Sequence, residues 1–226
     1  MSEIFIFHGS ENIIKKPLPG KGKKNNDYGQ GFYCTEDIDM AREWAVDENR
    51  DGHVSKYSLD ISPLCIIDLN SSDYCVLHWI SILLQNRRFE LDTPLSREGY
   101  RYLKENFTPD LTDVDVIRGY RADDSYFSYA DDFINGVISI KQLTSALHLG
   151  NLGEQIFIKS QKAFDSLRFQ GSEPVPASIW YAQKAMRDLR ARESYRKLNK
   201  NDYVPGELYM IRIIDEEVRA DDPRLQ

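Results

Sequence analysis

The sequence has few cysteines, and none lies in a metal-binding arrangement. Its three cysteines are Cys34, Cys65 and Cys75, and no Cys-x-x-Cys or His-x-x-x-His pair is present. An odd number of cysteines does not complete a disulfide framework, and structural zinc sites need closely spaced Cys and His ligands. We therefore expect reduced cysteines and no bound metal.

Long hydrophobic runs are also absent. No stretch approaches the roughly 20 apolar residues that a membrane helix needs, and the first residues, Met1–Phe7, lack the basic segment of a signal peptide. Positive charge is in short supply, because the net charge of −7 disfavours a general nucleic-acid coat protein. These absences predict a cytoplasmic protein that does not bind a membrane.

What is present indicates one folded domain. The chain has 226 residues, enough for a substantial core, and 12% of them are aromatic, which argues against global disorder. Predicted strands and helices alternate too irregularly for a doubly wound sheet, so we expect an α+β fold. No repeat or clear linker is found; the best internal break is 173–176. We expect one domain over 1–226, with 170–226 as a C-terminal extension of helix and strand.

Hydrophobic periodicity predicts the individual elements. Strands are predicted at 3–7, 30–34, 54–61, 65–69, 114–121, 154–159 and 207–214. Helices are predicted at 36–48, 72–88, 96–106, 126–135, 139–148 and 178–198. Thr35 is the predicted N-cap of the first helix, and Ser139 with Gln142 has the form of a capping box.

A glycine-rich segment, Gly29-Gln30-Gly31-Phe32-Tyr33, leads into the second predicted strand. Glycine permits positive φ and lets a ligand approach the backbone closely. The segment is not a dinucleotide-binding loop, which needs a third glycine and a following helix, and it lacks the Gly-Lys-Ser/Thr of a Walker loop. An ordinary glycine turn before a strand is the alternative reading of this segment alone.

The surrounding residues give the segment a family resemblance. His8-Gly9-Ser10 ends the first predicted strand, and Trp44 follows Tyr33 by 11 residues. This set resembles the ADP-ribosyltransferase superfamily of the His-Tyr-Glu kind, which includes poly(ADP-ribose) polymerases and diphtheria toxin. The nearest look-alikes are bacterial proteins of unassigned function with His-Gly-Ser, Gly-x-Gly-Phe-Tyr and a late Gln-Ile strand, over about 4–169. The resemblance implies a split β-sheet core of two packed small sheets with surrounding helices.

The resemblance also implies that NAD binds as a substrate. Tyr33 and Trp44 would stack on the two faces of nicotinamide, the backbone of Gly9 would pair with its carboxamide, and His8 would hydrogen-bond a ribose hydroxyl. The implied NAD-binding residues are His8, Gly9, Ser10, Gly31, Phe32, Tyr33 and Trp44. A buried core histidine and ordinary core packing of the tryptophan are the alternatives.

A later strand is implied to carry the catalytic group. In the family, a glutamate there stabilises the oxocarbenium-like charge that forms as nicotinamide leaves. Neighbouring strand residues face opposite ways, so only one of Glu154 and Gln155 can point into the cleft. The look-alikes align Gln155 with the catalytic position, whereas chemistry favours Glu154. The implied catalytic residues are therefore His8, Tyr33, Gln155 and Glu154.

One departure bears on affinity. Ala41 stands where relatives often carry a serine whose hydroxyl meets the carboxamide, so affinity for nicotinamide is expected to be lower by about 1 kcal/mol, the net value of one hydrogen bond.

Charged segments add two expectations. We expect the basic side chains of the loop 15–24 and the predicted helix 178–198 either to contact phosphates or to form a solvent-exposed surface. Asp123 and Asp124 orient an acceptor or cap a helix.

Together these patterns predict an NAD-dependent mono-ADP-ribosyltransferase that cleaves the nicotinamide–ribose bond and modifies a protein or nucleic acid. An NAD glycohydrolase, in which water replaces the acceptor, would use the same site. A non-enzymatic module that binds NAD or ADP-ribose is the third reading, motivated by Gln155 and Ala41. The resemblance further suggests a bacterial toxin or defence factor, for which a small inhibitory partner protein is conceivable.

Overall fold

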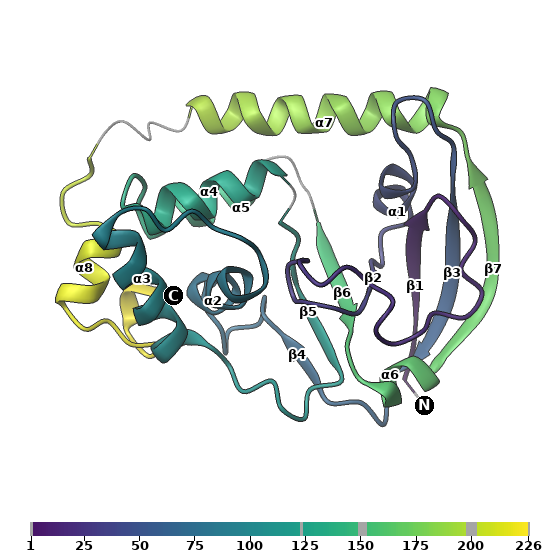
Figure 1. The fold of residues 1–226 in the computed structure, drawn as a ribbon, viewed down its shortest axis with the longest axis horizontal. Coiled ribbons are helices and arrows are strands. Elements are labelled where there is room, and N and C mark those ends of the chain that lie inside the picture. The colour runs from purple at the N-terminus through teal and green to yellow at the C-terminus, as the bar shows by residue number, and fades with distance from the viewer. Residues whose placement is uncertain (1, 123, 149–152, 198–202, 226) are drawn as a thin grey trace.

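The computed structural model describes residues 2–122, 124–148, 153–197 and 203–225 (Figure 1). The strands are β1 (Glu3–Ser10), β2 (Phe32–Cys34), β3 (Gly52–Asp60), β4 (Ile66–Asp68), β5 (Val116–Tyr120), β6 (Glu154–Ile158) and β7 (Leu167–Val175). The helices are α1 (Ile38–Ala45), α2 (Val76–Asn86), α3 (Pro94–Phe107), α4 (Asp124–Ile134), α5 (Ile140–His148), α6 (Gln161–Asp165), α7 (Ala177–Lys197) and α8 (Met210–Asp215), with a short 3-10 turn at Pro223–Leu225.

The strands form two small sheets, and the fold is α+β as predicted. One sheet has the order β1-β3-β7, with every pair antiparallel. The other has the order β2-β6-β5-β4, in which β4 and β5 are parallel and the remaining pairs are antiparallel. His8-Gly9-Ser10 ends β1 and residues 29–33 lead into β2, so the two predicted ligand-binding segments belong to different sheets. Contact between the two sheets therefore brings these segments together.

The two sheets meet next to the predicted motifs. Phe7 and Thr35 exchange backbone hydrogen bonds of 2.8 and 2.9 Å, which join the end of β1 to the residue after β2. Behind this contact, buried side chains from both sheets form a shared core that includes Ile6, Tyr57 and Ile158. The shared core fixes the position of His8 relative to Tyr33.

Helix α1 packs directly on β1 at Gly9. A Cβ atom on Gly9 would lie 1.8 Å from the carbonyl oxygen of Ala41, so only glycine lets the helix backbone approach this closely. Ala41, Ala45 and Val54 belong to the small core under the helix. This contact places Trp44, on the same helix, next to the end of β1.

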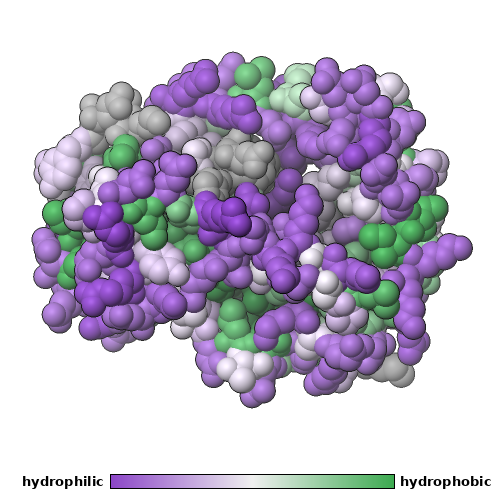
Figure 2. Space-filling model, viewed as in Figure 1, coloured by the Kyte–Doolittle hydropathy of each residue, from purple (hydrophilic) through white to green (hydrophobic). Residues whose placement is uncertain are grey.

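The remaining helices pack around the second sheet. Helices α2, α3, α4, α5 and α8 bury a large core against it, with Trp79, Phe107 and Phe133 among its fully buried side chains. With the apolar side chains gathered inside, the face seen in Figure 2 is largely hydrophilic, with hydrophobic residues only in patches. In the part of the chain that the structure describes, no helix has the length and apolar character needed to cross a membrane.

The long helix α7 bridges the two halves of the molecule and passes over both α1 and α4 (Figure 1). Near α1, Arg187 forms an ion pair of 2.6 Å with Glu43, and Lys184 donates a hydrogen bond of 3.0 Å to the carbonyl of Val46. Near α4, the ring of Tyr195 lies 3.7 Å from that of Tyr129, centroid to centroid. The helix is thus attached to both α1 and α4.

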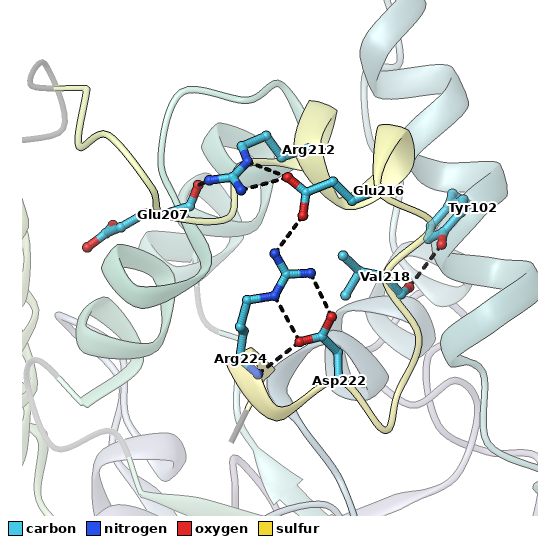
Figure 3. A network of polar contacts seen from close by, with 7 residues as sticks. All are labelled: Tyr102, Glu207, Arg212, Glu216, Val218, Asp222 and Arg224. Atoms are coloured by element: carbon cyan, nitrogen blue, oxygen red, sulfur yellow. Dashed lines mark hydrogen bonds and ion pairs between the residues drawn. The ribbon is translucent and has the colours of Figure 1, made fainter.

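A polar network holds the C-terminal segment in place (Figure 3). Arg212 and Arg224 both donate to Glu216, at 2.6 and 2.5 Å, and Arg224 also pairs with Asp222 at 2.7 Å. Tyr102 of α3 donates a hydrogen bond of 2.9 Å to the carbonyl of Val218. Residues 203–225 therefore pack against α3 through α8 and Val218.

Several predicted elements are confirmed with small shifts in their ends. Ser139 and Gln142 form the predicted capping box, with Ser139 N donating to Gln142 Oε1 at 2.8 Å and Gln142 N donating to Ser139 Oγ at 3.3 Å. The predicted N-cap of α1 is wrong by two residues. Asp37, and not Thr35, accepts from the N–H groups of Asp39 and Met40, at 2.9 and 3.2 Å.

The predicted last strand at 207–214 is wrong, because Met210–Asp215 is helix α8. Its isoleucine-rich sequence resembles a strand, but the buried residues Met210 and Ile213 are three apart and share one helix face. Met210 packs on α3 at Gly99, where a side chain would collide with it. Tertiary packing therefore decides this segment.

The sequence did not predict β7 or α6. Gly171 and Pro174 argue against a strand within β7. However, β7 is an edge strand paired only with β3, and the pairing is interrupted by a bulge near Gly171. Helix α6 has only five residues, too few for a periodic signal.

Candidate functional site

A cleft of about 630 Å³ lies at the meeting point of the two sheets, α1 and α7. Its walls come from the end of β1, the loop after it, the glycine segment and β2, and further from α1, the ends of α2 and β5, β6 and α7. The lining residues that carry the argument are His8, Gly9, Asp27, Gly31, Phe32, Tyr33, Trp44, Arg87, Arg121 and Gln155. Segments far apart in the sequence thus converge on one cavity.

His8 presents a neutral imidazole to the cleft. Its Nδ1 lies 2.7 Å from the carbonyl oxygen of Tyr33, and since a carbonyl only accepts, Nδ1 carries the proton and Nε2 keeps its lone pair. Burial lowers the pKa of His8, which keeps the ring uncharged at neutral pH. The ring also packs on Phe32, with centroids 4.3 Å apart. His8 is therefore oriented for hydrogen bonding through Nε2.

Tyr33 lies on the wall with its hydroxyl tied to the preceding loop. The hydroxyl donates to the carbonyl of Gly29 at 2.6 Å and accepts from the N–H of Tyr28 at 3.1 Å. Its ring packs against Phe157, with centroids 4.9 Å apart. Gly31 is required here, because a Cβ atom would lie 2.3 Å from the Phe157 ring. The glycine segment is thus a tightly packed floor of the cleft.

Trp44 also lines the cleft, as predicted for the second aromatic. The guanidinium of Arg121, which follows β5, lies 5.0 Å from the centroid of the Trp44 ring. This distance is typical of a cation–π contact. The guanidinium of Arg121 therefore covers one face of the Trp44 ring, and both side chains line the cleft.

The two neighbouring residues of β6 separate as strand geometry requires. Gln155 is 3% exposed and lines the cleft. The side chain of Glu154 is 50% exposed and lies outside the cleft, with its carboxylate 3.9 Å from Arg118. The structure therefore places Gln155, and not Glu154, among the cleft residues.

Asp27 is a buried carboxylate in the cleft that the sequence did not single out. It is 6% exposed, and its Oδ2 accepts from the N–H of Ala122 and from Nε2 of Gln155, both at 2.8 Å. Its Oδ1 lies 3.7 Å from Nε of Arg87. Burial raises the pKa of Asp27, while these donors and Arg87 act in the opposite direction.

The rim of the cleft is rich in cations although the chain as a whole is acidic. Lys21 and Lys23 come from the predicted basic loop, and Lys184, Arg187 and Arg192 come from α7. An anionic ligand would be attracted to such a rim. Both basic segments therefore place cationic side chains at the same cleft, where Arg187 is paired with Glu43.

Ser10 is a predicted site residue that lies outside the cleft. Its hydroxyl donates to the carbonyl of Asn12 at 2.8 Å. Asp123 lies outside the described residues, and Asp124 is the first residue of α4. Among the described residues, no three His, Cys, Asp or Glu side chains gather as metal ligands would.

The sequence missed Asp27, Arg87 and Arg121 as cleft residues. Asp27 stands in an Asn-Asn-Asp run just before the glycine segment, where aspartate is expected simply as a turn former. Arg87 and Arg121 lie at the ends of the elements predicted at 72–88 and 114–121, and nothing in their local sequence distinguishes them from surface arginines. Only the packing of distant segments brings these side chains together.

Comparison with protein-family models identifies the family of this chain. Residues 4–169 match the family described as "Protein of unknown function (DUF3990)", and because the match spans well over half of the chain, the protein belongs to this family. Comparisons with curated proteins and with solved structures gave no match. The matched range ends before α7, so the cations that this helix brings to the cleft lie outside it.

Proposed function

We propose that this protein is an NAD-dependent mono-ADP-ribosyltransferase. The observation that carries the proposal is the convergence of His8, Gly9, Tyr33, Trp44 and Gln155 on one cleft. They come from β1, β2, α1 and β6, and the resemblance implies a role in NAD binding or catalysis for each. A chance glycine turn or an isolated core histidine does not account for this convergence.

The cleft has the chemical groups that NAD requires. Tyr33 and Trp44 offer aromatic surfaces for the flat nicotinamide ring. His8 offers a lone pair on Nε2 to a ribose hydroxyl, and the backbone of Gly9 is available to the carboxamide. Lysines and arginines of the rim suit the diphosphate. In the proposed complex, nicotinamide replaces Arg121 on the Trp44 ring, and the arginine moves to the anionic part of the ligand.

The proposed reaction breaks the glycosidic bond between nicotinamide and C1″ of the ribose. The bonding electrons leave with the nicotinamide nitrogen, and the ribose becomes an oxocarbenium-like cation. An acceptor nucleophile on a protein or nucleic acid then forms a bond to C1″ and releases its proton to solvent. Water as the acceptor gives the glycohydrolase reaction at the same site.

Label transfer and nicotinamide release test this proposal. Purified protein is incubated with NAD labelled in the adenylate part and with cell lysate. We expect labelled macromolecules together with free nicotinamide. Nicotinamide without labelled macromolecules would favour the glycohydrolase. Binding of NAD or ADP-ribose without any nicotinamide release would leave only the binding module.

A matched pair of tryptophan variants tests the site itself. Trp44→Ala is expected to weaken NAD binding on the order of 10-fold, because a stacked aromatic pair contributes about 0.5–1.5 kcal/mol beyond its area burial. Trp180→Ala is the control, because Trp180 also lies under an arginine, Arg42 at 5.1 Å, but is outside the cleft. Equal NAD affinity of both variants in calorimetry would contradict the proposed site.

A further inference from the structure

The cleft replaces the glutamate expected on β6 with a pair of side chains, Gln155 and Asp27. The amide Nε2 of Gln155 donates at 2.8 Å to Asp27 and at 3.1 Å to the carbonyl of Tyr120. An amide nitrogen has two hydrogens, and these two contacts use both. Gln155 is therefore held as a support and has no N–H left to give to a substrate.

Asp27 has the features of a group that supplies charge. Its carboxylate lies in the wall of the cleft, with Oδ2 fixed by Ala122 N–H and Gln155. Burying a carboxylate is costly, and a neutral side chain would satisfy the same two donors. Arg87, whose Nε lies 3.7 Å from Oδ1, partly balances this negative charge in the resting protein, and a cation formed in the cleft would be stabilised by the same carboxylate.

We propose that Asp27 is the catalytic carboxylate of this protein and that Gln155 is the residue that positions it. This inference rests on the proposed NAD-cleaving function and concerns the same cleft. It assigns to a loop before β2 the charge that the resemblance assigns to the strand β6. The substrate group that Asp27 addresses is the ribose attached to a cationic leaving group.

The role of Asp27 follows the charge through the reaction. Before cleavage the positive charge is on the nicotinamide ring. As the C1″–N bond breaks, its electron pair moves to the ring nitrogen, nicotinamide becomes neutral, and the positive charge passes to C1″ and the ring oxygen of the ribose. The Asp27 carboxylate stabilises this charge and accepts a hydrogen bond from a ribose hydroxyl. It forms no covalent bond, and its protonation state does not change.

A pair of isosteric variants separates catalysis from folding. Asp27→Asn keeps an acceptor for Ala122 and Gln155 but removes the charge, so nicotinamide release should slow on the order of 10²-fold. The affinity for NAD should change by less than about threefold, since the loss is confined to the transition state. Asp115→Asn is the control, because Asp115 is also 6% exposed and also accepts from a backbone N–H, that of Cys65 at 2.8 Å, but lies outside the cleft.

A charge swap tests the pairing with Gln155. In Asp27→Asn/Gln155→Glu, the carboxylate moves to β6, and the amide introduced at position 27 can donate to it in place of accepting from the N–H of Ala122. The carbonyl of Tyr120 keeps its donors Tyr28 and Trp79. We expect this double variant to recover at least about one tenth of the wild-type rate, a rescue that a purely structural role of Asp27 would not produce. Because the swap keeps one carboxylate in the cleft, it also serves as the test if Asp27→Asn does not fold.

The outcomes distinguish the two proposals. Wild-type protein that releases no nicotinamide would overturn the proposed function and the catalytic role of Asp27 with it. Active wild-type protein together with an Asp27→Asn variant of nearly normal rate would overturn the role of Asp27 alone. A rate loss as large in Asp115→Asn, or a folded charge-swap variant with no recovery, would also overturn it. Slow Asp27→Asn, normal Asp115→Asn and a rescued swap would support it.

Discussion

Removing only the hydroxyl of Tyr33 tests how the cleft floor is held together. Tyr33→Phe deletes a hydrogen bond of 2.6 Å to the carbonyl of Gly29 and one of 3.1 Å from the N–H of Tyr28. The aromatic ring and its contact with Phe157 remain. The substitution therefore loosens the glycine segment without removing the surface on which a ligand ring would stack.

The expected loss of stability follows from these two bonds. Each contributes about 1 kcal/mol net, and a buried backbone group left without a partner costs about 1–3 kcal/mol. Because both groups are backbone groups of a partly buried loop, we expect a total of about 2–3 kcal/mol. For a chain of this size that lowers Tm by about 5–10 °C.

Urea denaturation and calorimetry measure the two consequences separately. The control is Tyr102→Phe, which deletes one hydrogen bond of 2.9 Å to the carbonyl of Val218 and should cost about 1 kcal/mol. NAD affinity should be retained in Tyr33→Phe and lost in Tyr33→Ala. A Tyr33→Phe variant that loses less than about 0.5 kcal/mol, no more than a neutral surface substitution, would refute the reasoning on the loop. Normal NAD binding by Tyr33→Ala would refute the reasoning on the ring.

Three further predictions concern the walls of the cleft. Burial lowers the pKa of His8 below its ordinary value of 6.5, so below that pH the unfolded chain takes up a proton more readily than the folded protein. The free energy of unfolding should therefore fall as the pH drops below 6.5. Urea denaturation at several pH values should show a less steep fall in His8→Asn. Arg187→Ala leaves the largely buried Glu43 without its ion-pair partner at 2.6 Å and should cost about 3 kcal/mol in urea denaturation, partly recovered by adding Glu43→Gln. Gly9→Ala brings a Cβ atom to 1.8 Å from the Ala41 carbonyl oxygen, so α1 must shift. We expect the free energy of unfolding to fall by about 3 kcal/mol and NAD binding to weaken. An unchanged free energy of unfolding together with unchanged NAD affinity would contradict this packing.

Local sequence signals were sufficient to predict strands with a clear apolar pattern and a helix with a clear N-cap. Alternating or continuous apolar residues located β1, β5 and β6, and the Ser139 capping box located the start of α5. The segments that failed were those with contradictory local signals. Gly171 and Pro174 concealed β7, and an isoleucine-rich stretch disguised α8 as a strand.

The candidate site likewise contains residues that the sequence analysis predicted and residues that only the tertiary structure revealed. The resemblance to a known family, carried by His8-Gly9-Ser10 and the glycine segment, directed attention to His8, Tyr33 and Gln155. The choice between Glu154 and Gln155 needed the orientation of β6. Asp27 gave no local signal, because an aspartate beside a glycine-rich turn is ordinary.

The sequence by itself determined an α+β fold of short strands and several helices, because period and capping are properties of neighbouring residues. Through the family resemblance, it also pointed to His8, Tyr33, Trp44 and Gln155 among the residues that line the cleft. Only the tertiary structure decided that Glu154 turns toward Arg118 and that Asp27 is bound to Gln155, 128 positions away in the chain. Such contacts depend on how two sheets and α7 pack together, and the balance of burial and charge that selects them is not present in any local stretch of sequence.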